Sequence, residues 1–235
     1  MKERKILITK NLKKTFQTKA SVLEVLRGVD FFAYEGEIVA ITGASGVGKS
    51  TFLHILGTLE KPTEGEVLYN LDGEFINPFT LKGLSISNFR NRYIGFVFQF
   101  HYLLTEFNVI ENIIMPELIG SYIGNSKIKQ DLKDKAFNLL KELDLERFAL
   151  HLPGELSGGQ QQKVAVARAL FRNPKVVLAD EPTGNLDSKS AFELFELFEK
   201  INNKWSTTFI IVTHNEAIAQ RCSRRLRMID GVLIY

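Results

Sequence analysis

The sequence predicts an α/β fold in which strands of a parallel sheet alternate with helices. Three short runs, residues 38–41, 176–179 and 209–212, consist only of apolar side chains. Unbroken apolar runs of this length are typical of strands that are covered on both faces of a parallel sheet. Helical patterns lie between the runs, and the alternation of strand and helix indicates crossover connections.

Two segments carry apolar side chains at helical spacing, which predicts helices with one face toward the core. The first segment follows Gly48 and contains Phe52, Leu53, Ile55, Leu56 and Leu59. The second contains Leu194, Phe195, Leu197, Phe198 and Ile201. A charged segment, residues 126–143, is predicted to be a helical insert whose apolar stripe is Leu132, Ala136, Leu139, Leu140 and Leu143.

The N-terminal third predicts a small, mainly antiparallel sheet beside the first parallel strand. Its apolar segments, residues 6–8, 23–32 and 67–69, are separated by turn residues such as Asn70 and the pair Asp72-Gly73. Near the C-terminus, Asp230-Gly231 stands between two apolar pairs, which predicts a hairpin.

Composition excludes several classes of protein. The 30 Lys and Arg against 27 Asp and Glu give a net charge of +3, which argues against a surface built to hold a nucleic-acid backbone. The single cysteine, Cys222, rules out an internal disulfide and suits a reducing compartment. The longest segment without Asp, Glu, Lys or Arg, residues 93–105, falls short of the roughly 20 residues of a membrane span. With no signal-peptide pattern, we expect a soluble cytoplasmic chain that reaches a membrane only through another subunit.

Residues 43–50 match the phosphate-loop pattern G-x-x-x-x-G-K-[ST] and lie between an apolar run and a helical pattern, as that loop requires. Its glycines let backbone N–H groups point at phosphate oxygens, and the next helix adds its positive dipole end. We expect Lys49 to reach the β- and γ-phosphates and Ser50 to bind Mg²⁺. The alternative is a glycine-rich turn beside an unrelated lysine. The residues assigned to nucleotide binding here are Gly43, Ala44, Ser45, Gly46, Val47, Gly48, Lys49, Ser50 and Thr51.

Polar side chains also follow the other two apolar runs. Asp180 ends one run and can hold Mg²⁺ through water, because ligands bind at the carboxyl ends of parallel strands. Glu181 comes next and can orient and polarise the attacking water as a general base. An N-cap followed by an exposed acid is the alternative for this pair. His214 follows the third run and can donate a hydrogen bond to a γ-phosphate, or be merely solvated.

A second anion site is predicted where Leu156-Ser157-Gly158-Gly159-Gln160 opens a helical segment, residues 161–171. A Ser-Gly-Gly start offers free N–H groups, a hydroxyl and close backbone approach. The alternative is a flexible helix cap. Because the chain already has one phosphate loop, the second can bind the phosphates of a nucleotide held by another copy.

With these motifs in place, the chain resembles the nucleotide-binding subunits of ATP-binding cassette (ABC) transporters over nearly its whole length. The motifs occur in the family's order: the phosphate loop, Gln99, the signature 156–160, Asp180-Glu181, the loop Asn185-Leu186-Asp187 and His214. The resemblance implies a P-loop NTPase (RecA-like) fold within one domain, residues 1–235. The catalytic core, with its N-terminal β subdomain, would consist of residues 1–98 and 172–235. An inserted α-helical subdomain would consist of about residues 99–171.

The resemblance also implies a mechanism. Two copies would form a head-to-tail homodimer around two ATP molecules, each held between the phosphate loop of one copy and Ser157, Gly158, Gly159 and Gln160 of the other. Gln99 would sense Mg²⁺ and the attacking water, and Asp187 would link the two sites. The catalytic residues would be Glu181, His214, Gln99 and Lys49, with Ser50, Gln99 and Asp180 at the metal. Phe16 matches the position where the family stacks an aromatic ring on adenine, with a plain core role as the alternative.

Within the family, residues 95–104, Glu111-Asn112 and Met115-Pro116 resemble the lipoprotein-releasing (LolD-type) ATPases. Residues 180–187 are shared with a wider group that includes MacB-like exporters and an FtsE-like division ATPase. The apolar segment after Gln99 matches the region that receives a membrane subunit in this family, although local core packing also accounts for it. One departure is Gln160-Gln161-Gln162-Lys163, where relatives often have Glu-Arg-Gln-Arg.

The resemblance therefore implies an ATPase that works with integral membrane permease subunits, without nucleic acid, on the cytoplasmic side of the bacterial inner membrane. A soluble ABC ATPase acting on DNA or ribosomes is one rival, but such relatives usually carry two cassettes or a coiled-coil insertion. A small-molecule phosphotransferase is another, and it leaves residues 156–160 without a role.

Overall fold

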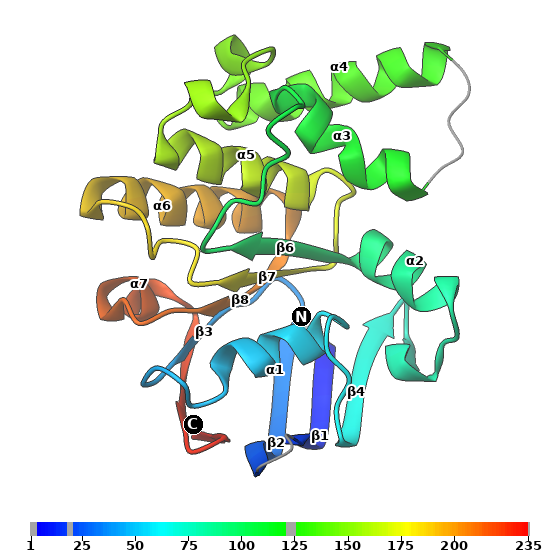
Figure 1. The fold of residues 1–235 in the computed structure, drawn as a ribbon, viewed down its shortest axis with the longest axis vertical. Coiled ribbons are helices and arrows are strands. Elements are labelled where there is room, and N and C mark those ends of the chain that lie inside the picture. Colours follow the sequence, from blue (N-terminus) through cyan, green and yellow to red (C-terminus); the bar gives the residue numbers. More distant parts are fainter. Residues whose placement is uncertain (1–3, 18–20, 121–125, 235) are drawn as a thin grey trace.

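The computed structural model describes residues 4–17, 21–120 and 126–234, and it contains two β-sheets with helices around them (Figure 1). The first sheet is antiparallel and has the strand order β2-β1-β4-β5. Its strands are β1 Lys5–Gln17, β2 Val22–Tyr34, β4 Glu64–Leu71 and β5 Glu74–Ile76. The predicted N-terminal antiparallel sheet is thus confirmed, and Asp72-Gly73 forms its predicted turn. Asn70, which we expected in a turn, instead lies inside β4 and is buried.

The second sheet has the order β10-β9-β3-β8-β7-β6, and all of its strands except β10 are parallel. The three apolar runs form its centre, which confirms the predicted α/β class. Its strands are β3 Ile38–Thr42, β6 Ile94–Phe98, β7 Val176–Asp180, β8 Thr208–Val212, β9 Arg224–Ile229 and β10 Val232–Ile234. Strands β9 and β10 form the predicted hairpin around Asp230-Gly231.

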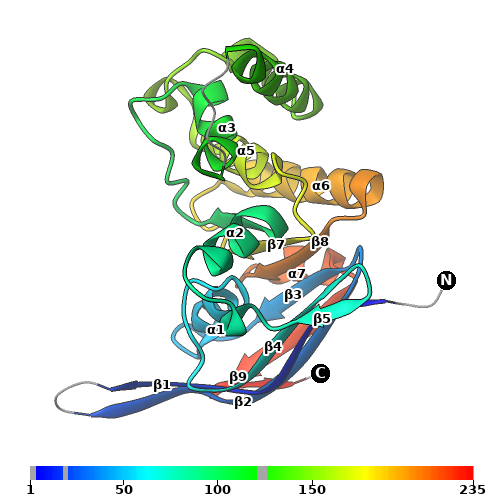
Figure 2. The same cartoon turned by 90° about the vertical axis from the view of Figure 1, so that its right-hand side faces the viewer.

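Seven α-helices are found among the described residues, and three of them, α3, α4 and α5, gather at one end of the molecule (Figures 1 and 2). They are α1 Lys49–Leu56, α2 Leu84–Tyr93, α3 Val109–Gly120, α4 Ser126–Glu142, α5 Gly158–Leu170, α6 Ser188–Trp205 and α7 Glu216–Arg221. Short 3₁₀ turns cover Pro78–Thr80, Glu146–Phe148 and Pro153–Glu155. Helix α1 ends before Leu59, so our expectation that Leu59 belongs to its apolar face was wrong, and this side chain is exposed.

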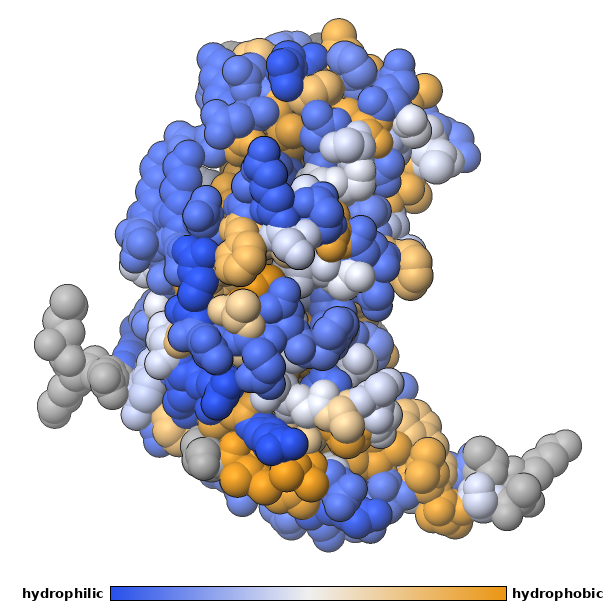
Figure 3. Space-filling model, turned by 90° about the vertical axis from the view of Figure 1, so that its left-hand side faces the viewer, coloured by the Kyte–Doolittle hydropathy of each residue, from blue (hydrophilic) through white to orange (hydrophobic). Residues whose placement is uncertain are grey.

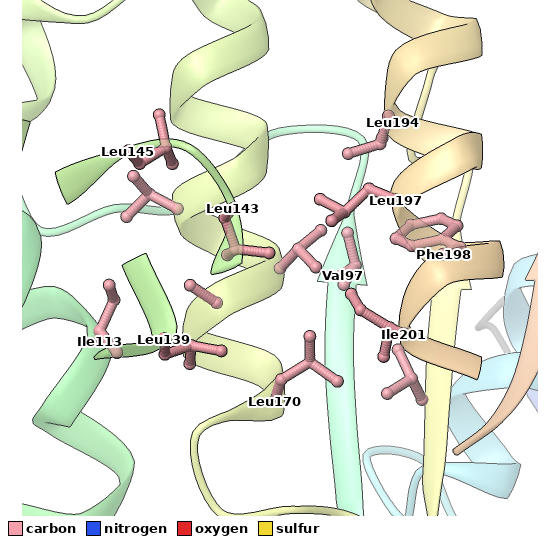
Figure 4. Close-up of a cluster of buried hydrophobic side chains, with 14 of the residues drawn as sticks. Val97, Ile113, Leu139, Leu143, Leu145, Leu170, Leu194, Leu197, Phe198 and Ile201 are labelled. Carbon is pink, nitrogen blue, oxygen red and sulfur yellow. The ribbon is translucent and has the colours of Figure 1, made fainter. Parts of the chain in front are cut away.

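Alternate residues of the parallel strands face two separate hydrophobic clusters, as expected for a sheet covered on both sides. In β7, Val177 and Ala179 belong to a cluster with α3, α4, α5 and α6, whereas Val176 and Leu178 face the other sheet and α1. Figure 4 shows the first cluster, where Val97 of β6 lies between Leu170 of α5 and Ile201 of α6. The predicted stripe of α6 is buried in this cluster. Of the stripe predicted for residues 126–143, Ala136, Leu139, Leu140 and Leu143 are buried there, whereas Leu132 is only partly buried and Leu143 lies just after α4.

The strand β6 has no room for larger residues at two contacts with its neighbours. A Cβ atom on Gly57, just after α1, would lie 1.7 Å from the ring of Phe96. A Cβ atom on Gly95 would lie 2.6 Å from the carbonyl oxygen of Ala169 in α5. These close approaches hold β6 against the end of α1 and against α5. They thereby also fix where the segment after Phe98 begins.

Candidate nucleotide site

The phosphate loop connects β3 to α1 and curls around the side chain of Lys49. Gly43, Gly46 and Gly48 have φ angles of 145°, 80° and 106°, which favour glycine, and a Cβ atom on Gly43 would lie 2.4 Å from the carbonyl oxygen of Met228. The Lys49 Nζ donates to the carbonyl oxygens of Gly43 at 2.9 Å and Ala44 at 2.8 Å. No side chain caps α1, so its first N–H groups are available to an anion.

A cavity of about 610 Å³ opens in front of this loop. Three sequence-predicted residues from other strand ends reach it: Gln99 after β6, Glu181 after β7 and His214 after β8. The remaining lining residues are Val25, Gly43, Ser45, Gly46, Gly48, Lys49, Ser50 and Thr51. Residues more than 160 positions apart in the sequence thus share one cavity because parallel strands end at the same edge of the sheet.

Asp180 does not line this cavity but a neighbouring one that shares Ser50, Gln99 and Glu181 with it, and it contacts α1. The Ser50 Oγ donates to Asp180 Oδ1 at 3.0 Å, and His54 Nε2 lies 3.7 Å from Asp180 Oδ2. Burial raises the pKa of the Asp180 carboxyl, and the hydrogen bond from Ser50 opposes that rise. A hydroxyl and a carboxylate at hydrogen-bond distance are a set of hard oxygen donors, the kind that Mg²⁺ prefers.

Glu181 adopts a backbone conformation that is rare for residues other than glycine, with a φ of 46°. Its N–H donates to Val212 O at 2.9 Å, and its carbonyl oxygen accepts from Gly184 N at 2.9 Å. Its Oε2 lies 2.9 Å from His214 Nδ1 and accepts from His214 N at 3.2 Å. The turn therefore presents the Glu181 carboxylate and the exposed His214 ring as a pair.

Gln99 is held by the loop that follows β7. Its Nε2 donates to Asn185 Oδ1 at 3.2 Å, while Asn185 Nδ2 donates to Gln99 O at 3.1 Å. Gly184 makes this contact possible, since a Cβ atom there would lie 2.8 Å from Gln99 Nε2. The Asn185 side chain therefore bonds both the side chain and the backbone of Gln99 beside the cavity.

The signature residues lie elsewhere on the surface and do not line the cavity of the phosphate loop. Ser157 caps α5: its Oγ accepts from Gln160 N at 3.4 Å, and its N–H donates to Gln160 Oε1 at 2.8 Å. Ser157, Gly159 and Gln160 line a separate pocket of about 230 Å³ beside α6. Within one chain, the structure thus keeps the two predicted anion sites apart.

Phe16 and Asp187 also lie outside the cavity. Phe16 is 36% exposed near the end of β1, with Lys14 Nζ 4.6 Å from its ring centroid. Figure 3 shows hydrophobic side chains gathered at the lower end of the molecule. Val22 and Leu23 of β2 and Val232 and Ile234 of β10 are exposed. Asp187 caps α6, and its hydrogen bonds from the Ser190 hydroxyl at 2.7 Å and the Ser190 N–H lower the pKa of its carboxyl.

A protein-family model described as ABC transporter matches residues 26–184 of this chain. The chain belongs to the ABC transporter family. It is 45% identical over 229 residues to the lipoprotein-releasing system ATP-binding protein LolD of Geobacter metallireducens, covering 97% of this chain and 98% of the relative. It is 47% identical over 222 residues to LolD of Cytophaga hutchinsonii, covering 93% and 95%. These relatives confirm the resemblance to LolD-type ABC transporter proteins.

Solved structures of ABC transporter cassettes share the fold. A dimeric ATP-binding cassette in a post-hydrolysis state with ADP and inorganic phosphate superposes with a TM-score of 0.85 and is 38% identical, covering 98% of this chain and 97% of that one. The cassette cbiO1 of Clostridium perfringens superposes with a TM-score of 0.83 and is 28% identical, covering 99% and 88%. The cassette fold predicted from the sequence is confirmed.

The segment after Gln99 is exposed in this ABC transporter chain. Phe100 and Tyr102 are 60% and 65% exposed, and Leu104 and Phe107 are also on the surface, while Leu103 packs against the core. The Arg168 guanidinium of α5 holds the backbone beneath, donating to the carbonyl oxygens of His101 and Tyr102 at 2.7 and 2.6 Å. Most of the apolar side chains in this segment therefore do not pack in the core.

Sequence reasoning assigned no contact with the predicted site to three residues that the structure places there. His54 lies against Asp180, Asn185 clamps Gln99, and Gln162 bonds the backbone on both sides of the cavity. His54 had a signal, since it stands one helical turn after Ser50 on the same face of α1. The partners of Asn185 and Gln162 lie 20 to 86 residues away, so no local pattern pointed to them.

Proposed function

We propose that this chain is the ATP-hydrolysing subunit of an ABC transporter that releases lipoproteins from the bacterial inner membrane. The observation that carries the ATPase assignment is the meeting of the phosphate loop with Gln99, Glu181 and His214 in one cavity. These residues come from four separate segments, and each supplies a group that phosphoryl transfer to water requires.

The phosphate loop would bind the β- and γ-phosphates of ATP. The uncapped N-terminus of α1 offers backbone N–H groups, and the Lys49 ammonium can exchange its bonds to the loop carbonyls for phosphate oxygens. The exposed ring of Phe16 would stack on the adenine. This division places the charged part of ATP at the sheet edge and its apolar part at the hairpin.

The Glu181 carboxylate would orient the attacking water and accept its proton. His214, which lies 2.9 Å from Glu181 Oε2, would hold this carboxylate in place and donate to the γ-phosphate. Gln99, fixed by Asn185, would line the same side of the cavity. A carboxylate on a rigid turn is well suited to this role because positioning supplies much of the rate enhancement.

Ser50 and Asp180 are the residues that would hold Mg²⁺, which neutralises charge developing on the phosphates when it is bound. The described residues contain no cluster of three or more His, Cys, Asp or Glu side chains able to hold a metal. One hydroxyl and one carboxylate are nevertheless a fitting set, since Mg²⁺ commonly takes one or two protein ligands and completes its shell with substrate phosphates and water.

Two copies would pair head to tail on ATP. The signature loop of one chain, with Ser157, Gly158, Gly159 and Gln160, would then cover the phosphates held by the other, and Asp187 would lie near the junction. This arrangement gives the separate pocket of the signature loop a ligand. The solved cassette bound to ADP and inorganic phosphate is itself dimeric, which supports the arrangement.

The membrane partner would be a pair of integral permease subunits that contact the exposed apolar segment 100–107. No described helix of this chain has both the length and the apolar character needed to cross a bilayer. We therefore place the chain at the cytoplasmic face of the inner membrane, held by its partner. The relatives named for lipoprotein release support the choice of cargo.

The substitution Glu181→Gln tests the ATPase assignment. It keeps the size of the side chain but removes its charge, so we expect ATP binding to persist, steady-state hydrolysis to fall roughly 10²- to 10⁴-fold, and an ATP-bound dimer to accumulate in size-exclusion chromatography. The control is Glu216→Gln, which alters an exposed carboxylate paired with Arg225 at 2.8 Å and should leave turnover unchanged. Normal hydrolysis by the Glu181 variant would refute the assignment.

The partner is tested by purifying the chain from membranes in mild detergent and identifying the integral protein that accompanies it. A lipoprotein-release permease supports the proposal. A cell-division protein or a drug exporter in its place would redirect the assignment to another branch of the same group, and salt-sensitive binding to nucleic acid would favour a soluble ABC ATPase.

A further inference from the structure

Gln162 is a fully buried polar residue in α5, three residues after Gly159 of the signature. Its Nε2 donates two hydrogen bonds, one to the carbonyl oxygen of Phe98 at 3.0 Å and one to that of Pro182 at 2.8 Å. Phe98 immediately precedes Gln99, and Pro182 immediately follows Glu181. One side-chain amide therefore ties together the backbones that carry two of the residues lining the nucleotide cavity.

The position of this amide follows from the sheet. Strands β6 and β7 are paired up to Phe98 and Asp180, and after these residues the two segments continue into different loops. The Gln162 amide donates one hydrogen bond to each segment at the point where they separate. It thereby continues the connection between the strands where the ladder of backbone hydrogen bonds has ended.

Stability alone does not account for a glutamine at this position. Its Oε1 is buried and accepts no hydrogen bond from any residue that the structure describes, which costs free energy that an apolar side chain of the same shape would avoid. Meanwhile Glu181 keeps its unfavourable φ of 46°, a conformation that persists only where its surroundings fix it. Pro182 directly follows Glu181, and the hydrogen bond from Gln162 to the Pro182 carbonyl is one of the contacts that fix the Glu181 backbone.

We propose that Gln162 is a positioning residue for hydrolysis, which holds the Glu181 turn and the Gln99 segment at a fixed separation across the nucleotide cavity. This inference rests on the proposed ATPase function. Because Gln162 belongs to the helix that Ser157 caps, it also connects the catalytic turn of a chain to its own signature loop. Arg168, further along the same helix, holds the segment after Gln99 at its other end through His101 and Tyr102.

The test compares Gln162→Met with two control variants by steady-state ATP hydrolysis, ATP affinity and thermal unfolding. Gln161→Met makes the same change one residue earlier, where the amide donates to Pro153 O and Leu156 O at 3.0 and 3.2 Å. Asn202→Leu removes another amide that bonds two carbonyls, those of Gly36 and Thr207, both at 2.8 Å and outside the nucleotide cavity. All three variants lose two comparable hydrogen bonds.

We expect Gln162→Met to lower kcat by about 10- to 100-fold, because small displacements of a positioned group have effects of this size, while the Kd for ATP stays within about threefold of the wild type. The two controls should lose thermal stability but keep kcat. The proposal is overturned if Gln162→Met retains the wild-type kcat, if the controls lose kcat equally, or if ATP affinity falls as much as kcat.

If the methionine variant does not fold, Gln162→Asn replaces it, since the shorter amide fills most of the space but cannot reach both carbonyl groups. The same split between kcat and Kd is then expected, and a wild-type kcat would again overturn the proposal. Failure of the ATPase assignment itself gives a different result, because the wild-type chain would then show no hydrolysis that depends on Glu181.

Discussion

Helices α1 and α5 each begin at a predicted anion site, yet they begin in opposite ways. Gly48 precedes α1 with a left-handed φ of 106° and provides no side-chain cap. Ser157 precedes α5 and forms a reciprocal capping box with Gln160. The first helix therefore leaves its N–H groups for a ligand, whereas the second already satisfies some of its own.

This difference indicates how the two sites are used. An anion can bind at α1 without displacing a protein group other than the carbonyl contacts of Lys49. An anion at α5 has to compete with the Ser157 cap. We therefore expect the phosphate loop to bind ATP in a single chain, and the signature loop to engage only when a second chain presents a phosphate that is already held.

Removing the charge at the α1 site should have the largest effect. Lys49→Met takes away the ammonium that points into the loop, and a hydrogen bond to a charged group contributes about 1.5–3 kcal/mol. We expect ATP affinity of the isolated chain to fall about 10- to 100-fold, as measured by titration with a fluorescent ATP analogue. Lys13→Met, which removes an exposed ion pair with Glu64 at 2.7 Å, is the control and should bind ATP normally.

Removing the α5 cap should have a smaller effect of a different kind. Ser157→Ala should reduce the free energy of unfolding by about 1 kcal/mol. It should also lower kcat by about tenfold, which corresponds to the loss of one hydrogen bond of about 1.4 kcal/mol. The ATP affinity of the isolated chain should stay unchanged. Chemical denaturation and steady-state kinetics measure the two losses separately.

Asn108→Ala is the matched control for Ser157→Ala. Asn108 and Glu111 exchange the same pair of bonds at the start of α3, both at 2.9 Å. Its loss should lower stability without lowering kcat. If Ser157→Ala weakened ATP binding by a single chain, the proposed division between the two helix ends would be wrong.

The smallest effect should come from Asp187, which caps α6 on the surface. Hydrogen bonds from Ser190 lower the pKa of this carboxyl in the folded chain. The ionised carboxylate therefore contributes its full stabilisation above the pKa of an aspartate in the unfolded chain, about 4. This stabilisation is lost as the pH falls through the lower pKa of the folded chain. Asp187→Ala should therefore lower the thermal unfolding midpoint slightly at pH 7, and by less at about pH 3. Asp187→Asn, which can still cap, should differ less from the wild type at pH 7. A deficit that grows in acid would contradict this reasoning.

Local patterns predicted most of the elements that pack on one another. The apolar runs became β3, β7 and β8 because continuous apolar segments need cover on both faces, and the stripe of α6 is buried for the same reason. Strand β6 was not predicted, since Gly95 and the aromatic residues around it resemble neither an apolar run nor an alternating strand. The contact of Phe96 with Gly57 explains that composition, and it appears only in three dimensions.

The sequence alone determined the chemical groups and their order along the chain. The phosphate loop, the acidic pair Asp180-Glu181 and the Ser-Gly-Gly start of α5 are local, because each needs particular residue types at adjacent positions to form a turn or a helix end. The tertiary structure alone decided how these groups are held. The clamp of Asn185 on Gln99 and the link from Gln162 to Phe98 and Pro182 join segments up to 86 residues apart. Such contacts depend on where strands end and helices cross, and a side-chain amide has no local signature that names its partners.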